Sequence, residues 1–169
     1  LANTGGIKLG TKFCLDQTRP GIGLYGIDNY GQNIRLLSKD LILPFELHAP
    51  IIQIRNVNIN QPISYNGIEK TKRKSTLATI GIGYADGWIR LLKPNSHFWL
   101  YKKRCNILGN ITMDSFVLDI TDIKEKVFTE GDYFCLLDNS NISSIIKNSE
   151  LISYELLTLL GSRLVRDYN

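Results

Sequence analysis

The sequence lacks any long apolar run. No uninterrupted apolar stretch in its 169 residues approaches the roughly 20 that a membrane-spanning helix needs, so we expect no membrane segment. Hydrophobic residues make up 43% and charged residues 21% of the chain, as in ordinary globular proteins. The first ten residues have neither the basic start nor the apolar stretch of a signal peptide, and they look like a cut end.

Cysteine is scarce. The three cysteines, Cys14, Cys105 and Cys135, are an odd number and show no paired metal-type spacing. This pattern fits reduced thiols in the cytoplasm better than a disulfide framework. We therefore expect neither disulfides nor a metal site.

The charge excess is also small. The net charge is +4, and the one dense basic cluster contains Lys70, Lys72, Arg73 and Lys74 with no aromatic residue among them. Nucleic-acid surfaces usually combine a basic stripe with aromatic stacking platforms, and neither is present. A solvated loop is the favoured interpretation, and no nucleic-acid partner is expected.

What the chain does have, through its middle, is short runs of Ile and Val broken by Asn, Gly and Pro, which indicate strands and turns. Phe116, Leu118 and Ile120 alternate with other residues, which places them on one face of a sheet. The predicted strands are 44–57, 76–84, 98–105, 115–121 and 132–137. The fold class is therefore mainly β.

Both ends of the chain differ from this pattern. Apolar residues recur at three and four positions between Ile142 and Leu160, which predicts two short helices separated near 150–153. Gly161 is suited to end the second helix in the left-handed conformation. Residues 1–26 are rich in glycine and fit neither pattern, so we place a boundary near 28–41. The expected units are 1–40 and 41–169.

One glycine-rich stretch, Gly21–Gly26, has the G-x-G-x-x-G spacing. The dinucleotide fingerprint also needs a preceding strand and a following helix, whereas Arg19-Pro20 precedes this stretch and Asp28-Asn29 follows it. The dinucleotide interpretation is therefore rejected. A more general property remains, because backbone N–H groups at glycines can approach a phosphate closely.

Three further motifs have ordinary structural explanations when each is taken alone. The stretch 81–88, G-I-G-Y-A-D-G-W, suggests a hairpin with a turn at Asp86-Gly87. Met113 is the only methionine and suggests packing, and Tyr154 suggests a half-buried residue at a helix start.

The order of the motifs changes this interpretation. The chain contains R-P-G-I-x-L-Y-G, then S-Y, G-Y-A-D-G-W, M-D and finally I-S-Y-E-L-L-T-x-L-G-x-R. In this order they closely resemble the alanine racemases over essentially the whole chain. The resemblance implies an alanine racemase carboxyl-terminal β domain with short carboxyl-terminal helices, preceded by a remnant of a (β/α)8 barrel. A complete barrel takes about 250 residues, so most of it, with the lysine that holds pyridoxal phosphate, is expected to lie outside this chain.

The resemblance assigns cofactor contacts to five residues. Arg19 matches an arginine that donates to the pyridine nitrogen of pyridoxal phosphate, and a guanidinium can only donate, which keeps that nitrogen unprotonated and weakens the ring as an electron sink. Gly21 and Ile22 match backbone N–H groups on the phosphate. Thr4 matches a phosphate-binding hydroxyl, and Tyr154 matches a tyrosine on the same phosphate.

Tyr65 matches the catalytic base for the L-alanine face of the substrate. Racemisation needs a proton to leave one face and another to arrive on the opposite face, so the resemblance implies two bases, this tyrosine and the lysine. Free tyrosine has a pKa of about 10, so the family chemistry requires a partner that activates it. The chain departs from the family pattern here, because S-Y-G is replaced by S-Y-N-G, with Asn66 as the difference.

The resemblance also assigns residues to the substrate site. Met113 matches a residue whose backbone N–H contacts the substrate carboxylate in the partner's site. Tyr84, Arg90 and Asp114 match the substrate entrance. Asn110 stands where an arginine is common, which is a second departure.

The resemblance therefore implies part of a cytoplasmic, homodimeric alanine racemase that makes D-alanine for peptidoglycan, with active sites shared between subunits. The chain alone is expected to be inactive. One alternative is a racemase of another amino acid such as serine. A second is a small, non-catalytic β-barrel binding module, which would bind a polyanion in a salt-sensitive manner.

Overall fold

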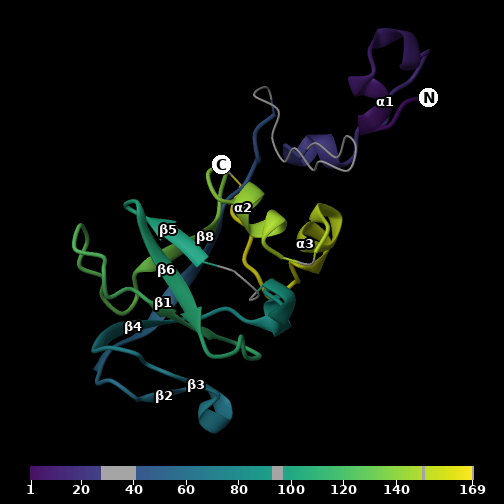
Figure 1. The fold of residues 1–169 in the computed structure, drawn as a ribbon. Coiled ribbons are helices and arrows are strands. Elements are labelled where there is room, and N and C mark those ends of the chain that lie inside the picture. Colours follow the sequence, from purple (N-terminus) through teal and green to yellow (C-terminus); the bar gives the residue numbers. More distant parts are fainter. Residues whose placement is uncertain (28–40, 93–96, 150, 169) are drawn as a thin grey trace.

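The computed structural model describes residues 1–27, 41–92, 97–149 and 151–168. Its main feature is a six-stranded sheet in the order β5-β6-β7-β4-β1-β8, with every neighbouring pair antiparallel (Figure 1). The strands are β1 (Leu47–Val57), β4 (Ser75–Ile80), β5 (His97–Leu100), β6 (Lys103–Leu108), β7 (Phe116–Asp119) and β8 (Tyr133–Leu137). The expected mainly β architecture is confirmed.

Strand β1 joins the two sides of this sheet. Its first residues, Leu47–Pro50, pair with β8, and the stretch from Ile51 to Val57 pairs with β4. The register shifts between Ile51 and Gln53, which marks a bulge. Eleven residues are enough for two different neighbours because each pairing uses a separate part of the strand.

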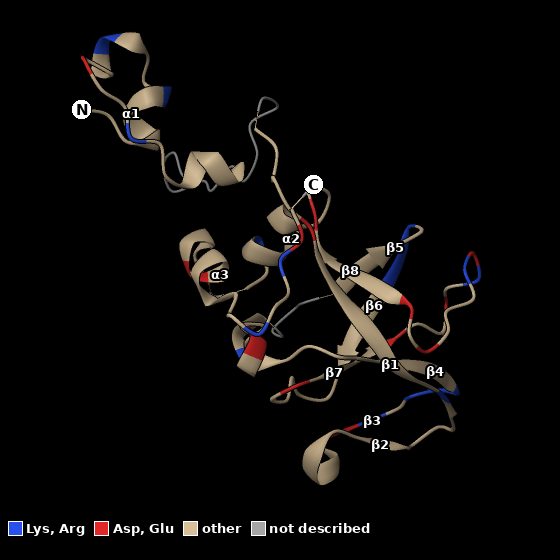
Figure 2. Cartoon of the chain, turned by 180° about the vertical axis from the view of Figure 1, so that it is seen from behind, with Lys and Arg blue, Asp and Glu red and all other residues tan. Residues whose placement is uncertain are grey.

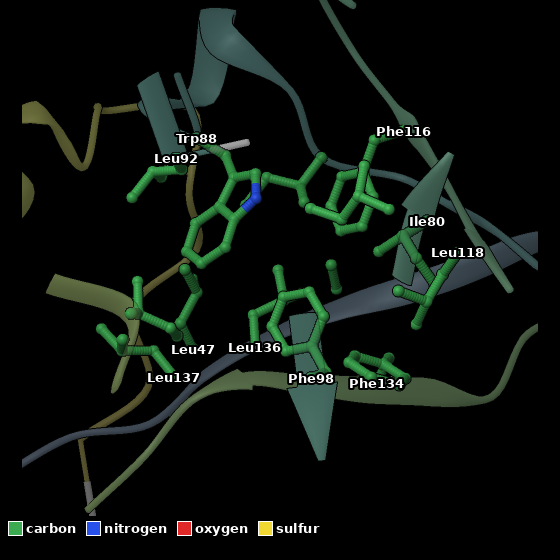
Figure 3. Close-up of a cluster of buried hydrophobic side chains, with 14 of the residues drawn as sticks. Leu47, Ile80, Trp88, Leu92, Phe98, Phe116, Leu118, Phe134, Leu136 and Leu137 are labelled. Atoms are coloured by element: carbon green, nitrogen blue, oxygen red, sulfur yellow. The ribbon is translucent and has the colours of Figure 1, made fainter. Parts of the chain in front are cut away.

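The core on one side of the sheet is built around four aromatic rings (Figure 3). The Phe98 ring stacks on Phe116 at 6.2 Å between centroids and meets Phe134 edge-on at 5.3 Å. Trp88 stacks at 6.2 Å from Phe98 and is almost fully buried. Such rings bury large apolar areas and gain further from offset and edge-to-face geometry. The predicted alternation in β7 is confirmed, because Phe116, Leu118 and Ile120 are all buried.

Two predicted helices are present at the carboxyl end. They are α2 (Ile142–Lys147) and α3 (Ser153–Leu159), and α2 buries three isoleucines against the core. The expectation for Gly161 was wrong, because it does not take the left-handed conformation. Instead Leu160 ends α3 in an extended conformation (ψ 103°), and the Gly161 N–H donates to the Asp86 carbonyl at 3.1 Å.

The predicted single strand 98–105 is a hairpin instead. Tyr101 (φ 48°) and Lys102 (φ 63°) form a two-residue turn between β5 and β6. Two successive left-handed residues give the turn twist that suits a tight hairpin, although neither residue type is among those usually found there. A second, small sheet of β2 (Pro62–Ile63) and β3 (Glu69–Lys70) was not predicted.

Residues 1–27, here the N-terminal lobe, project away from the sheet in both views (Figures 1 and 2). The lobe contains α1 (Thr4–Lys8) and two short 3-10 turns, Thr11–Phe13 and Ile22–Tyr25. Ile22 and Ile27 belong to the hydrophobic core of the chain. The predicted boundary at 28–41 lies almost entirely outside the described residues, so the division into 1–40 and 41–169 stays a prediction. None of the described helices is long and apolar enough to cross a membrane.

Gly87 shows how tightly the loops fit against the core. It has φ +99°, and a Cβ there would lie 2.0 Å from the Leu159 carbonyl oxygen. Gly131 has a similar φ of +93°, but a Cβ there would meet nothing within 4 Å. An alanine would suffer backbone strain at either position. Only at Gly87 would its methyl group also collide with a neighbouring segment.

We therefore expect Gly131→Ala to lower the free energy of unfolding by ~1 kcal/mol, from backbone strain alone. Gly87→Ala should cost a further ~1–3 kcal/mol, because α3 must move to admit the methyl group. Urea unfolding followed by circular dichroism measures both. Equal losses for the two variants would contradict the predicted collision.

Candidate functional site

The structure brings Thr4 together with the glycine motif of the N-terminal lobe. The Thr4 hydroxyl oxygen accepts hydrogen bonds from the N–H groups of Gly21 at 3.0 Å and Gly23 at 3.2 Å. A Cβ at Gly23 would lie 2.8 Å from the Thr4 methyl carbon, whereas Gly21 faces open space. The Thr4 hydroxyl thus holds the two glycine N–H groups together at one point of the lobe. Ile22 lies between the two glycines with its side chain in the core.

Arg19 lies beside this loop. Its backbone N–H donates to the Ala2 carbonyl at 2.6 Å, next to an isolated β-bridge between Ala2 and Thr18. Its side chain is exposed and lines a hollow of about 520 Å³ together with Asn3 and Phe13. The guanidinium is therefore accessible to a ligand in this hollow.

Tyr154 is the second residue of α3, and 48% of it is exposed. The α3 amino terminus is held by a side-chain cap, since Glu155 Oε2 accepts the Ile152 N–H at 2.9 Å. Thr4 and Gly21 are brought together by the fold, but the convergence of Tyr154 with them stays a prediction.

The G-Y-A-D-G-W motif does not form the hairpin that it suggests in isolation. Residues Tyr84–Asp86 form a 3-10 turn, and Gly87 follows in the left-handed conformation, as the predicted turn at Asp86-Gly87 requires. The Tyr84 N–H donates to the Thr112 carbonyl and the Ala85 N–H to the Met113 carbonyl, both at 3.0 Å. A Cβ at Gly83 would lie only 2.3 Å from the Thr112 oxygen, so this contact needs glycine. Two predicted entrance and substrate residues, Tyr84 and Met113, are therefore held side by side.

Arg163 fastens these two loops to the carboxyl-terminal segment. Its Nε lies 3.2 Å from Asp86 Oδ1 and its guanidinium donates to Asp114 Oδ1 at 2.8 Å. Asp86 is mostly buried, and its other oxygen accepts the Gly83 N–H at 2.9 Å. The hydrogen bond that Arg163 donates to Asp114 and the nearby charge of Asp86 raise the pKa of Arg163. Asp86 and Arg163 appeared in the sequence motifs, but their pairing was not predicted.

Tyr65 lies on an exposed turn. Ser64 (φ 66°), Asn66 (φ 62°) and Gly67 (φ 57°) all have positive φ, so the backbone conformation of the turn is unusual on both sides of Tyr65. Asparagine tolerates this conformation better than most residues, which explains how Asn66 fits. The Tyr65 side chain is 74% exposed.

A neighbouring loop supports the Tyr65 turn. The Ser64 hydroxyl accepts the Asn110 N–H at 3.2 Å, and Glu69 Oε2 accepts the Gly109 N–H at 2.8 Å. A Cβ at Gly109 would lie 2.4 Å from the Ser64 Cβ. Asn110 thus touches the turn through its backbone.

The predicted site residues do not all lie together. Tyr65 lies in one place, and Thr4 and Arg19 lie in another. The β2–β3 hairpin that carries Tyr65 lies at the opposite end of the molecule from the N-terminal lobe (Figure 1). Tyr65 therefore does not reach Thr4 or Arg19 of its own chain.

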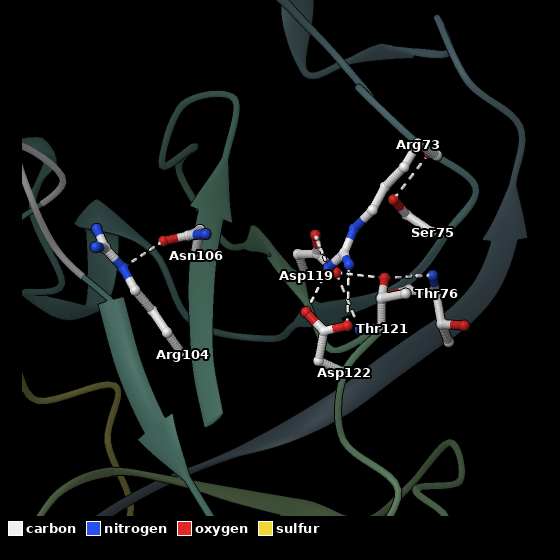
Figure 4. A network of polar contacts seen from close by, with 8 residues as sticks. All are labelled: Arg73, Ser75, Thr76, Arg104, Asn106, Asp119, Thr121 and Asp122. Carbon is white, nitrogen blue, oxygen red and sulfur yellow. Dashed lines mark hydrogen bonds and ion pairs between the residues drawn. The ribbon is translucent and has the colours of Figure 1, made fainter. Parts of the chain in front are cut away.

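The remaining entrance residue, Arg90, is exposed on the 3-10 turn Arg90–Leu92. It lines a hollow of about 880 Å³ between the Lys70–Arg73 segment and β6. On the same side of the sheet, Arg73 binds both Asp122 oxygens at 2.9 and 2.6 Å and lies 3.6 Å from Asp119 (Figure 4). The hydrogen bond from Arg73 lowers the pKa of Asp122. Arg73 is thus engaged within the fold, and Lys70 of the same basic cluster lies in β3.

Comparison with known proteins decides the family. The family model described as "Alanine racemase, C-terminal domain" matches residues 44–168. The chain belongs to the alanine racemase family. The alanine racemase of Rickettsia rickettsii (strain Sheila Smith) is 36% identical over 172 residues, covering 99% of this chain and 45% of that protein. That of Brucella ovis is 35% identical over 178 residues with the same coverage.

Solved structures of alanine racemases agree with the fold. The Bartonella henselae enzyme, solved with covalently bound pyridoxal phosphate, has a TM-score of 0.82 and 36% identity over 99% of this chain and 46% of its own. The Acinetobacter baumannii enzyme has a TM-score of 0.78 and 25% identity, covering 98% and 46%. The chain thus spans less than half the length of these relatives.

The Arg163 bridge gives a prediction for the entrance loops. Arg163→Gln removes the charge that joins Asp86 and Asp114, so we expect several-fold faster hydrogen exchange at the Tyr84 and Ala85 amides, which bond to the 112–113 loop. Arg166→Gln is the matched control, because Arg166 donates to the Leu160 carbonyl and reaches neither aspartate in the described structure. Amide exchange by NMR measures both variants, and unchanged exchange in Arg163→Gln would show that the loops do not need the bridge.

Proposed function

We propose that this chain is the carboxyl-terminal part of a pyridoxal-phosphate-dependent alanine racemase, which interconverts L- and D-alanine and provides D-alanine for peptidoglycan. The observation that carries the proposal is the placement of Tyr65. It is exposed on its turn and lies far from Thr4 and Gly21 in the N-terminal lobe of its own chain. The three cysteines of the chain are free thiols, which supports a cytoplasmic location.

The N-terminal lobe fits a phosphate-bearing cofactor. An anionic oxygen on the open side of Gly21 would replace the Thr4 hydroxyl oxygen as the acceptor of the Gly21 N–H, and the Thr4 hydroxyl would then turn to donate to it. Ile22 and Tyr154 are the further phosphate contacts that we propose. When bound, pyridoxal phosphate supplies an electron sink that makes the α-proton of the amino acid removable.

Arg19 would face the pyridine nitrogen. A guanidinium has five N–H donors and no acceptor, so it keeps that nitrogen unprotonated. The resulting weaker electron sink favours return of the proton to the α-carbon over its transfer elsewhere. The exposed Arg19 side chain on the 520 Å³ hollow is compatible with this role.

Tyr65 would hold and move a proton at its phenolic oxygen. It removes the α-proton of L-alanine, or returns one to that face, while a lysine outside this chain serves the opposite face. A rigid turn suits this task, because proton transfer requires an oxygen fixed within hydrogen-bond distance of the α-carbon proton. The hydrogen bond from the Asn110 N–H to the Ser64 hydroxyl restrains the turn against the neighbouring loop.

The separation of the two groups supports a homodimer with shared active sites. Tyr65 and the 112–114 loop are held on the β domain, and Thr4 and Arg19 on the lobe at the other end. In a two-fold dimer, the β domain of one subunit can face the lobe of its partner. Met113 would then offer its backbone N–H to the substrate carboxylate, with Tyr84, Arg90 and Asp114 at the entrance.

The test uses the full-length protein that contains this chain. Tyr65→Phe should lower alanine racemisation by about 10²–10⁴-fold, because one general base is lost. Exchange of the α-proton of D-alanine with solvent deuterium should survive, since the other face keeps its base. Both are measured by NMR in deuterium oxide, and Tyr133→Phe, an exposed tyrosine on β8, is the control.

Full L-to-D activity in Tyr65→Phe would show that this tyrosine is not the base. Mixing separately inactive Arg19→Ala and Tyr65→Phe subunits tests the sharing of sites, because a mixed dimer contains one site with both native residues. Recovery of activity is expected. If mixing restores nothing although mixed dimers form, both residues act within one chain.

The chain by itself should not racemise alanine. The lysine base and most of the cofactor site are proposed to lie in the part of the relatives that this chain does not span. Purified chain incubated with pyridoxal phosphate and L-alanine should give no D-alanine in a D-amino-acid oxidase assay. Clear turnover would contradict the division of the site between two parts.

A further inference from the structure

A cluster of three metal-ligand side chains lies outside the site described above. Glu46, His48 and Cys135 each place one ligand atom so that all three lie within 4.8 Å of one another. His48 Nε2 and Glu46 Oε2 are 2.8 Å apart, and both side chains are substantially exposed. The cluster is therefore open to ions from solvent.

The sheet itself brings these side chains together. His48 and Cys135 are direct cross-strand partners in the antiparallel β1–β8 pair, and such partners project from the same face. Glu46 precedes β1, two residues before His48, so an extended backbone points it the same way. The arrangement depends on strand pairing and is not an accident of a loose surface loop.

Negative groups surround the thiol. Cys135 Sγ lies 3.8 Å from Asp138 Oδ2, which adds a fourth possible ligand atom beside the cluster. Burial and the charges of Asp138 and Glu46 raise the pKa of the Cys135 thiol to about 11. A bound divalent cation would reverse this electrostatic penalty and favour the thiolate.

We propose that Glu46, His48 and Cys135 bind a divalent transition-metal ion, with zinc as the natural occupant. One imidazole, one thiolate and one carboxylate are all ligands that zinc accepts, whereas magnesium and calcium take oxygen ligands. The fourth tetrahedral position is taken by water or by Asp138.

The distances fit a tetrahedral ion after small side-chain rotations. Zinc bond lengths of about 2.0–2.3 Å place neighbouring ligand atoms about 3.4–3.6 Å apart. The present 2.8 Å contact between His48 and Glu46 opens by less than ~1 Å to admit the ion between them. Ligand atoms that now lie up to 4.8 Å apart would close to this spacing through rotation of the three side chains.

The ion would fasten the point at which the chain enters the β domain. Glu46 lies just before β1, and Cys135 is the middle residue of β8. A pair of hydrogen bonds already joins the same regions, because the Leu43 N–H donates to Asn139 Oδ1 and the Asn139 amide donates to the Leu43 carbonyl. Metal binding would reinforce this junction, since an ion that binds only the folded state stabilises it.

Titration of the reduced, metal-free chain with Co²⁺ tests the proposal. A tetrahedral site with a thiolate gives intense visible bands and a thiolate-to-cobalt charge-transfer band in the near ultraviolet, and Zn²⁺ should then displace the cobalt. Cys135→Ser should remove the charge-transfer band, and Cys14→Ser, on the N-terminal lobe, should keep it. His48→Gln and Glu46→Gln should each weaken Co²⁺ binding more than ~10-fold, because loss of even an outer-shell partner costs this much.

His97→Gln is the matched control for His48→Gln, because the chain has only two histidines. Circular dichroism of each metal-free variant confirms that it is folded, and the two exposed positions, 46 and 48, carry the test if Cys135→Ser does not fold. Zn²⁺ should raise the Tm of the wild type and of His97→Gln but not that of His48→Gln. Absence of the charge-transfer band in the wild type, or equal weakening in the 48 and 97 variants, overturns the proposal.

Discussion

The pairing of β1 with two different neighbours is the constraint on which the rest of the structure depends. The first part of β1 pairs with β8 and the second part pairs with β4. The bulge after Ile51 is the point at which β1 changes partner. This pairing brings Phe134 on β8 and Ile80 on β4 into the same core. It also sets the His48–Cys135 register, so one strand connects the core to the proposed zinc ligands.

Close backbone approach, more than charge, positions the loops of the candidate site. At Gly83, Gly87 and Gly109 a methyl group would collide with a neighbouring segment. Each contact lets one loop lie directly on the next, and hydrogen bonds such as Tyr84 N–H to Thr112 O then fix the register. Arg163 is exposed and adds an ion pair to an arrangement that the backbone already determines, which is consistent with the modest strength of surface ion pairs.

The sequence predicted the features that arise from local patterns. The alternation of Phe116 and Leu118 located β7, and the spacing of Ile142, Ile145 and Ile146 located α2, because burial follows the period of each element. The turn at Tyr101 was missed because large side chains rarely occupy left-handed turns. The family motifs identified Tyr65 and Thr4 as candidates, although the structure leaves their roles as proposals.

Other features were beyond sequence reasoning because they come from tertiary pairing. Strands β2 and β3 have two residues each, too few for any periodicity. The Asp86–Arg163 bridge and the His48–Cys135 register pair join residues far apart in the chain, and cysteine spacing alone gave no sign of the second. Gly161 was expected to adopt a left-handed cap, but its N–H bonds to Asp86 and the helix ends one residue earlier.

The distance between the Tyr65 turn and the N-terminal lobe has a kinetic consequence under the proposed function. When the catalytic base and the cofactor-binding residues lie at opposite ends of one chain, only an assembly of two chains is active. Dilution separates the chains, so turnover per molecule falls. Two separated molecules would each keep a folded core and intact catalytic residues but would form no product. For such a protein, cellular abundance and the affinity between copies regulate flux as directly as the residues that move the proton.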